Sequence, residues 1–77
     1  MTVAYEEIVD FIASGPTPER VAEFQPSEQA RERVAELIGR KKSSALTSEE
    51  ESELAHWLQL EHVMRLAKAK ARQRLGP

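Results

Sequence analysis

The segment that begins at Thr47 constrains the fold more than any other part of the chain. Thr47 and Glu50 form a capping-box pattern, in which each side chain accepts a hydrogen bond from the backbone N–H of the other residue. No Pro or Gly follows until Gly76, so the sequence predicts one helix over residues 48–75. At 1.5 Å per residue this helix is about 42 Å long, which is longer than a domain of this size is wide.

Two shorter segments near the N-terminus carry helix start and stop signals. Residues 3–14 place apolar side chains at helical spacing, and Thr2 is positioned to cap their first turn. Gly15 and the proline after it end this helix, because Gly adopts the left-handed conformation and Pro lacks a backbone N–H. Residues 18–24 then predict a short helical turn that begins at Pro18.

A further segment, residues 28–42, carries a narrow apolar stripe, and Gly39 leaves open whether its helix ends there or continues. No alternation of apolar and polar residues persists over five positions, so no strand is expected. The expected fold class is all-α, with three helices and a short connecting helical turn in one domain over residues 1–77. Because the last helix is so long, we expect a helical bundle that is completed by oligomerisation or by a partner protein.

The long C-terminal helix carries two apolar stripes that face different directions. Leu54, Trp57 and Leu58 share the first stripe, which we expect to pack against the chain's own shorter helices. The second stripe is rotated by about 100° or more, so one covering surface does not reach both. An exposed stripe of this size is unusual for a monomer and predicts a partner-binding surface. That surface comprises the second stripe and the basic residues beside it: Leu60, Val63, Met64, Ala67, Ala71, Arg65, Lys68 and Arg72.

Charge is unevenly distributed along the chain. All 13 acidic residues lie between Glu6 and Glu61, where six basic residues leave a formal charge of −7. The segment from His62 to Pro77 carries five basic residues and no acidic one, a charge of +5. Two interpretations stay open: the basic residues contact a partner, or they complement the dipole of their own helix. They surround the helix and include no aromatic base readers, so we do not expect the chain alone to bind nucleic acid.

Glu61 lies in the middle of an apolar face, where a buried carboxylate is costly unless it is paired. Arg65 stands four residues later, in the favoured order for an ion pair on one helix. Arg31 or Arg33 could also reach Glu61 across a helix interface. A boundary position with the carboxylate in water is the other interpretation.

Glu53 and His56 form an ExxH pair, the spacing that di-iron four-helix proteins use. Glu23, Glu32 or Glu36 would have to supply a further carboxylate. A solvated helix face also accounts for the pair, and it is the preferred interpretation because only one such motif occurs.

Other chemistry has little support in the sequence. The chain has no Cys, which excludes disulfides, thiolate zinc sites and cysteine nucleophiles. It also lacks Gly-rich phosphate loops, and no Ser or Thr at helical spacing with either His builds a set of nucleophile, base and orienting acid. We therefore expect no enzymatic activity and no cofactor. No apolar run exceeds three residues, which predicts neither a membrane span nor a signal peptide and favours the cytoplasm.

Three segments together resemble a family of short bacterial proteins of about this length: YEEIVDFIA from Tyr5, FQPS from Phe24 and LEHVMRLAKAKAR from Leu60. Proteins of that family are commonly encoded beside a small HNH-type nuclease. The resemblance implies an antitoxin-like protein that binds and restrains its neighbour. The alternative function is a homo-oligomeric structural protein, and a homodimer is compatible with both because small cores often gain stability from self-association.

Overall fold

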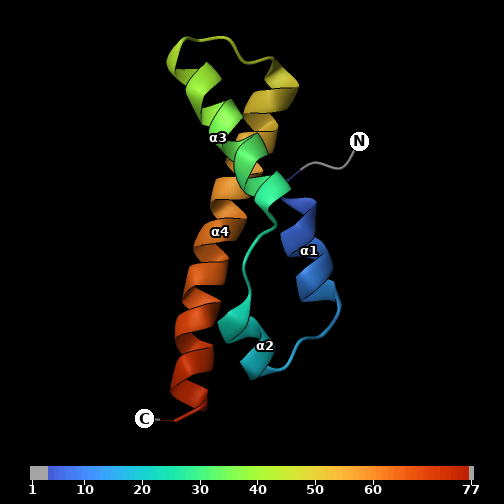
Figure 1. Ribbon diagram of the computed structural model, residues 1–77, viewed down its shortest axis with the longest axis vertical. Helices are drawn as coiled ribbons and strands as arrows, with labels where there is room; N and C mark the ends of the chain where they lie inside the picture. The colour runs from blue at the N-terminus through green and yellow to red at the C-terminus, as the bar shows by residue number, and fades with distance from the viewer. Residues whose placement is uncertain (1–3, 77) are drawn as a thin grey trace.

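The computed structural model describes residues 4–76, and its helices extend along one long axis (Figure 1). The elements are α1 (Glu6–Ala13), α2 (Pro18–Glu23), α3 (Glu28–Lys42) and α4 (Ser48–Arg74). No strand occurs among the described residues, so the all-α class is confirmed for this part of the chain. The bounds of α2, α3 and α4 lie within one residue of the expected ones. α1 begins at Glu6, three residues later than the expected start, and the proposed cap Thr2 lies outside the described residues.

α4 runs the length of the molecule, and the other helices pack against successive parts of it (Figure 1). Its capping box forms as predicted: the Glu50 N–H donates to Thr47 Oγ1 over 3.1 Å, and the Thr47 N–H donates to Glu50 Oε1 over 3.0 Å. Its 27 residues span about 40 Å at the usual rise per residue. The molecule measures 45 × 23 × 19 Å, so its longest dimension is set by this one helix.

α3 packs antiparallel to the N-terminal half of α4. A Schellman turn reverses the chain between them, because the Ala45 N–H donates to the Arg40 carbonyl over 2.9 Å and the Ser44 N–H donates to the Lys41 carbonyl over 3.0 Å. Ser44 takes the left-handed conformation that this turn requires, with φ 56°. Gly39 does not end α3, which continues for three more residues.

The segment between α2 and α3 is held against α1. The rings of Phe11 in α1 and Phe24 after α2 have centroids 4.4 Å apart. The Glu7 carboxylate accepts a hydrogen bond from the Ser27 backbone N–H over 2.9 Å and a second from the Ser27 hydroxyl. Ser27 also caps α3, since its hydroxyl accepts from the Ala30 N–H. These contacts fix residues 24–27 between α1 and α4, where the chain leads into α3 (Figure 1).

The core forms where α1 and α3 meet the first two thirds of α4. Its buried members are Ala4, Ile8, Ala30, Val34, Leu37, Leu54, Trp57 and Met64. The expectation for the first apolar stripe is therefore confirmed at Leu54 and Trp57. It is wrong at Leu58, whose side chain is 49% exposed.

The second apolar stripe is covered more fully than expected. Met64 belongs to the core and Ala71 is 4% exposed, while Leu60 and Ala67 are half-buried and Val63 is exposed. The expectation that Ala71 is open to a partner is wrong, and Met64 belongs mainly to the core, because the buried side of α4 runs between the two stripes, through residues spaced by seven. α2 lies against the C-terminal half of this side, where small alanine side chains leave room for it.

The helices of the described residues do not meet the requirements for a membrane span, because none combines enough length with enough apolar character.

Candidate protein-interaction groove

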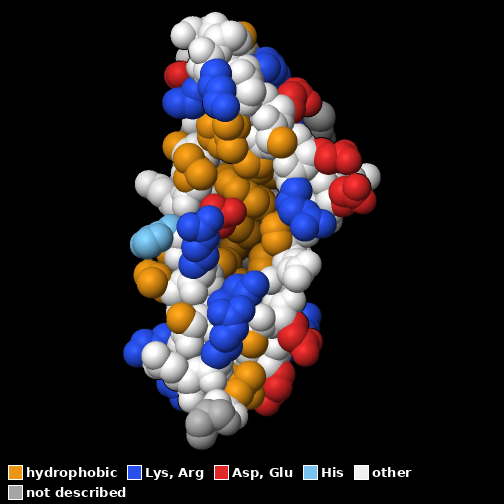
Figure 2. All heavy atoms as spheres, turned by 60° about the vertical axis from the view of Figure 1, so that its left-hand side comes forward, with side chains coloured by type: hydrophobic (Ala, Val, Ile, Leu, Met, Phe, Trp, Pro, Cys, Tyr) orange, Lys and Arg blue, Asp and Glu red, His pale blue; other side chains and the backbone are white. Residues whose placement is uncertain are grey.

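A groove with an apolar floor and a charged rim lies between α4, α1 and the segment after α2. Its volume is about 160 Å³. Figure 2 shows the hydrophobic surface as a strip along the molecule, with Lys and Arg side chains at its edges. Pockets for drug-sized ligands enclose about 300–1,000 Å³, so this groove has room for a side chain or two of a protein partner. Ile8, Phe24, Pro26, Trp57 and Met64 form its floor, and Glu61, Arg65 and Lys68 form its rim.

The end of α2 builds one wall of the groove. Gln25 precedes Pro26, and a residue before proline favours extended backbone, so the helix stops after Glu23. Phe24, the C-cap of α2, has φ −59° and ψ 132°, which lies outside the helical region. Its ring packs on Phe11, whose other neighbour is the Arg20 guanidinium at 5.7 Å from the ring centroid. The chain thus enters α3 with an aromatic residue and a proline placed beside α4.

Lys68 connects α4 to this wall. Its Nζ donates a hydrogen bond to the Phe24 carbonyl over 2.9 Å, which satisfies an acceptor that the end of α2 leaves free. Lys68 is half-buried, so its cation closes one end of the groove.

Arg65 and Glu61 form the ion pair that the i,i+4 spacing predicts, with 3.2 Å between Arg65 Nη2 and Glu61 Oε1. The alternative pairing of Glu61 with Arg33 is wrong, because Arg33 binds Glu53. The Arg65 side chain is 73% exposed, and an exposed pair of this kind contributes only about 0.3–0.5 kcal/mol. A carboxylate on a partner therefore competes with Glu61 for Arg65 at little cost.

Three of the residues predicted to bind a partner line the groove: Met64 on its floor, and Arg65 and Lys68 on its rim. Arg72 is exposed and lies seven residues beyond Arg65, on the same side of α4. Leu60, Val63, Ala67 and Ala71 do not line it. The contributions of Ile8, Phe24 and Pro26 were not predicted, although an aromatic residue near a proline at the end of a short helix is a signal of a fixed wall.

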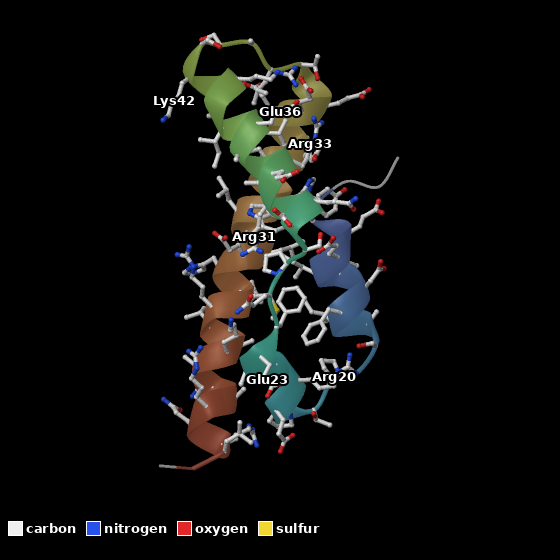
Figure 3. The ribbon with its side chains drawn as sticks, viewed as in Figure 1. Arg20, Glu23, Arg31, Arg33, Glu36 and Lys42 are labelled. Carbon is white, nitrogen blue, oxygen red and sulfur yellow. The ribbon has the colours of Figure 1, made fainter. Side chains whose placement is uncertain are left out.

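The residues considered as metal ligands have other roles. Glu53 is 7% exposed, and each of its oxygens accepts a hydrogen bond of 3.1 Å from Arg33. The His56 ring lies 5.1 Å from that of Tyr5. Figure 3 places Glu23 on α2, far along the molecule from Glu36 on α3. Within residues 4–76, no group of three or more potential ligands gathers to hold a metal ion.

Arg33 and Glu53 belong to a polar network that joins α3 to α4. The hydrogen bonds that Arg33 donates to Glu53 raise the pKa of Arg33 above its ordinary value. Arg40 continues the network, with Nη1 3.1 Å from Glu36 Oε1 and Nη2 2.7 Å from Glu50 Oε1. An open hollow of about 450 Å³ lies beside the network and is lined by Arg33, Glu50 and Glu53 of the network and by Tyr5, Thr47, Glu49, Ser52 and His56. Because Arg33, Glu50 and Glu53 are already paired between the helices, we interpret this hollow as structural.

Comparisons with known proteins identify no relative: no protein family model, curated protein sequence or solved structure matches the chain. The resemblance to short bacterial proteins encoded beside an HNH-type nuclease thus stays a prediction. Function is inferred from the groove and from the charges around it.

Proposed function

We propose that the protein is a non-catalytic helical interaction module of the cytoplasm, whose groove binds an apolar and acidic segment of a partner protein. The observation that supports this most strongly is the combination of an apolar floor with the exposed cation of Arg65 on the rim. A partner side chain buried on Trp57 and Met64 supplies apolar contact, and acidic residues beside it pair with the rim. Arg72 extends the cationic edge for a longer segment.

For the partner, we propose the small HNH-type nuclease that the sequence resemblance implies, in an antitoxin-like arrangement. The charge of the chain is compatible with this choice. An enzyme that acts on nucleic acid presents a basic surface, and the segment from Glu6 to Glu61 carries a formal charge of −7. The groove would then anchor the nuclease while the acidic helices face its basic surface.

Calorimetric titration against the product of the adjacent gene tests the proposal, which expects that product to be a small HNH-type nuclease. The Arg65→Glu variant is expected to bind at least tenfold more weakly, because it replaces an attractive rim charge by a repulsive one. Lys42→Glu is the matched control, since Lys42 is an exposed cation at the far end of α3 and its loss leaves the groove intact (Figure 3).

Two results would contradict this proposal. Separate migration of the two wild-type proteins in size exclusion would remove the nuclease as the partner. Equal affinity of the wild type and Arg65→Glu would remove the groove as the binding site. Circular dichroism of each variant verifies that α4 stays helical.

A further inference from the structure

The outward side of α4 carries an uncharged stripe along its full length. Its positions are separated alternately by four and three residues, which is the spacing of a coiled-coil seam. Ten of the 27 residues of α4 are charged, yet none of them lies on this stripe, and every member is exposed. The members, called the outer stripe below, are Ser48, Ser52, Ala55, Gln59, His62, Leu66, Ala69 and Gln73.

The exposed apolar side chains of α4 gather on or beside the outer stripe. Leu66 lies on it and is 58% exposed, and Leu58 and Val63 lie at its two edges, each 49% exposed. In Figure 1, α1, α2 and the segments that join them all lie on one side of α4, and α3 crosses to the other side only near the N-terminal end of α4. The outer stripe is therefore a seam without a partner within residues 4–76.

The charges of α4 determine which partner and which direction fit this seam. All five acidic residues of the helix lie in its first half, between Glu49 and Glu61, and all five basic residues lie between Arg65 and Arg74. Two parallel copies of α4 would place like charges side by side. Two antiparallel copies place the acidic half of each helix beside the basic half of the other.

Aligning two antiparallel copies end to end gives a register in which the outer stripes match. Leu66 then lies opposite Ala55 of the second copy, so the largest side chain of the stripe meets a small one. In the same register Glu51 lies beside Arg72 of the second copy, and Glu49 lies beside Lys70 of the second copy. These are the edge positions at which charged pairs select partner and orientation in coiled coils.

We propose that α4 binds α4 of a second copy of this chain through the outer stripe, as an antiparallel coiled coil. Several seam positions are polar, and exposed ion pairs are weak and screened by salt. The dimer is accordingly reversible, and its affinity falls as salt is raised. The dimer leaves the floor of the proposed partner groove open, because that floor faces α1 and the segment after α2. The two sites share only Arg72, which extends the cationic edge of the groove and pairs with Glu51 across the seam.

Disulfide trapping tests the direction of the pair, because the chain has no Cys of its own. Ser52→Cys and Ala69→Cys place thiols opposite each other only between antiparallel copies in this register. Oxidation of a mixture of the two variants is expected to give a cross-linked heterodimer, whereas each variant alone stays uncross-linked. Cross-linking of Ser52→Cys with itself would indicate parallel copies and overturn the proposal, as would the absence of any cross-link.

Sedimentation equilibrium tests whether the outer stripe carries the association. Leu66→Lys is expected to shift the protein from dimer to monomer, since it places a charge at the seam. Ile12→Lys is the matched control, because Ile12 is 47% exposed on α1 and away from the outer stripe, and we expect it to leave the dimer intact. A wild-type protein that stays monomeric at sub-millimolar concentration, or a Leu66→Lys variant as dimeric as the wild type, would refute the proposal.

Discussion

Replacing Arg33 by Met tests whether the buried carboxylate of Glu53 depends on one cation. Glu53 is 7% exposed, and both of its oxygens bind Arg33. The nearby Arg40 already binds Glu36 and Glu50. Met keeps the apolar stem of the arginine but removes all of its donors. The variant therefore leaves a buried charge without its partner.

The expected cost follows from the burial of the pair. Removing one member of a buried ion pair costs about 3–5 kcal/mol. The Arg33 side chain is 28% exposed, so water reaches this side of the pair and we expect about 2–3 kcal/mol. Each kcal/mol shifts the Tm of a domain of this size by about 4–8 °C, which gives a decrease of roughly 10–20 °C. Combining Arg33→Met with Glu53→Leu removes the unpaired charge and should restore most of the loss.

Guanidinium denaturation followed by the fluorescence of Trp57 measures these differences, since Trp57 is the single tryptophan and is 3% exposed. Arg31→Met is the matched control: Arg31 is exposed and lies on the other side of α3 from Arg33 (Figure 3), so its loss should change the unfolding free energy by less than about 0.5 kcal/mol. The reasoning is refuted if Arg33→Met unfolds at the same denaturant concentration as the wild type, or if the double variant is no more stable than Arg33→Met.

Three further predictions concern stability. Ser44→Gly removes the strain of a non-glycine residue in the left-handed conformation, with φ 56°, and thermal denaturation should show that the unfolding free energy rises by about 0.5–1 kcal/mol. A lower unfolding free energy would indicate that the contacts of the Ser44 side chain outweigh this strain. Gly39→Ala places a methyl group in open space on the exposed side of α3, and the same assay should show a gain of about 0.5–1 kcal/mol, which an unchanged Tm would contradict. The Thr47 backbone N–H and the Arg40 guanidinium hold the pKa of Glu50 below its ordinary value of 4.5. Because folding lowers this pKa, the stabilisation is present above the pKa of the unfolded chain and is lost as the pH falls through the pKa of the folded chain. The denaturant concentration at the unfolding midpoint should therefore decrease once the pH is lowered below about 4.5, and Glu50→Gln should make this decrease smaller.

Local chemistry allowed the helix boundaries to be predicted from sequence. The Thr47 capping box and the proline at the start of α2 act within one helical turn of the residues that they control, so no tertiary information is needed. The Arg65–Glu61 pair was predictable for the same reason. The pairing of Arg33 with Glu53 was not predicted: Arg33 lies nine residues before the end of α3 and Glu53 only five after the start of α4, so their distances from the turn do not match.

The placement of α2 could not be predicted in this way. Its six residues are too few to show a helical period, so nothing in them reveals which side faces α4. Without that information Ala71 appeared to be free for a partner. For a related reason, only the α4 residues of the groove were predicted. Ile8 and Phe24 lie more than thirty residues from Trp57 in sequence, and only the folded chain brings them together.

The packing of the short helix α2 on α4 determines which part of the folded chain unfolds locally first. Beyond Lys68, a single six-residue helix packs against α4, whereas α3 and α1 protect the turns around Trp57. Backbone amides in that last part should exchange with deuterium fastest, and uptake should spread from the C-terminal end toward Trp57. The basic residues there are cleavage points for trypsin, so brief digestion should shorten α4 from this end and leave the α3–α4 hairpin whole.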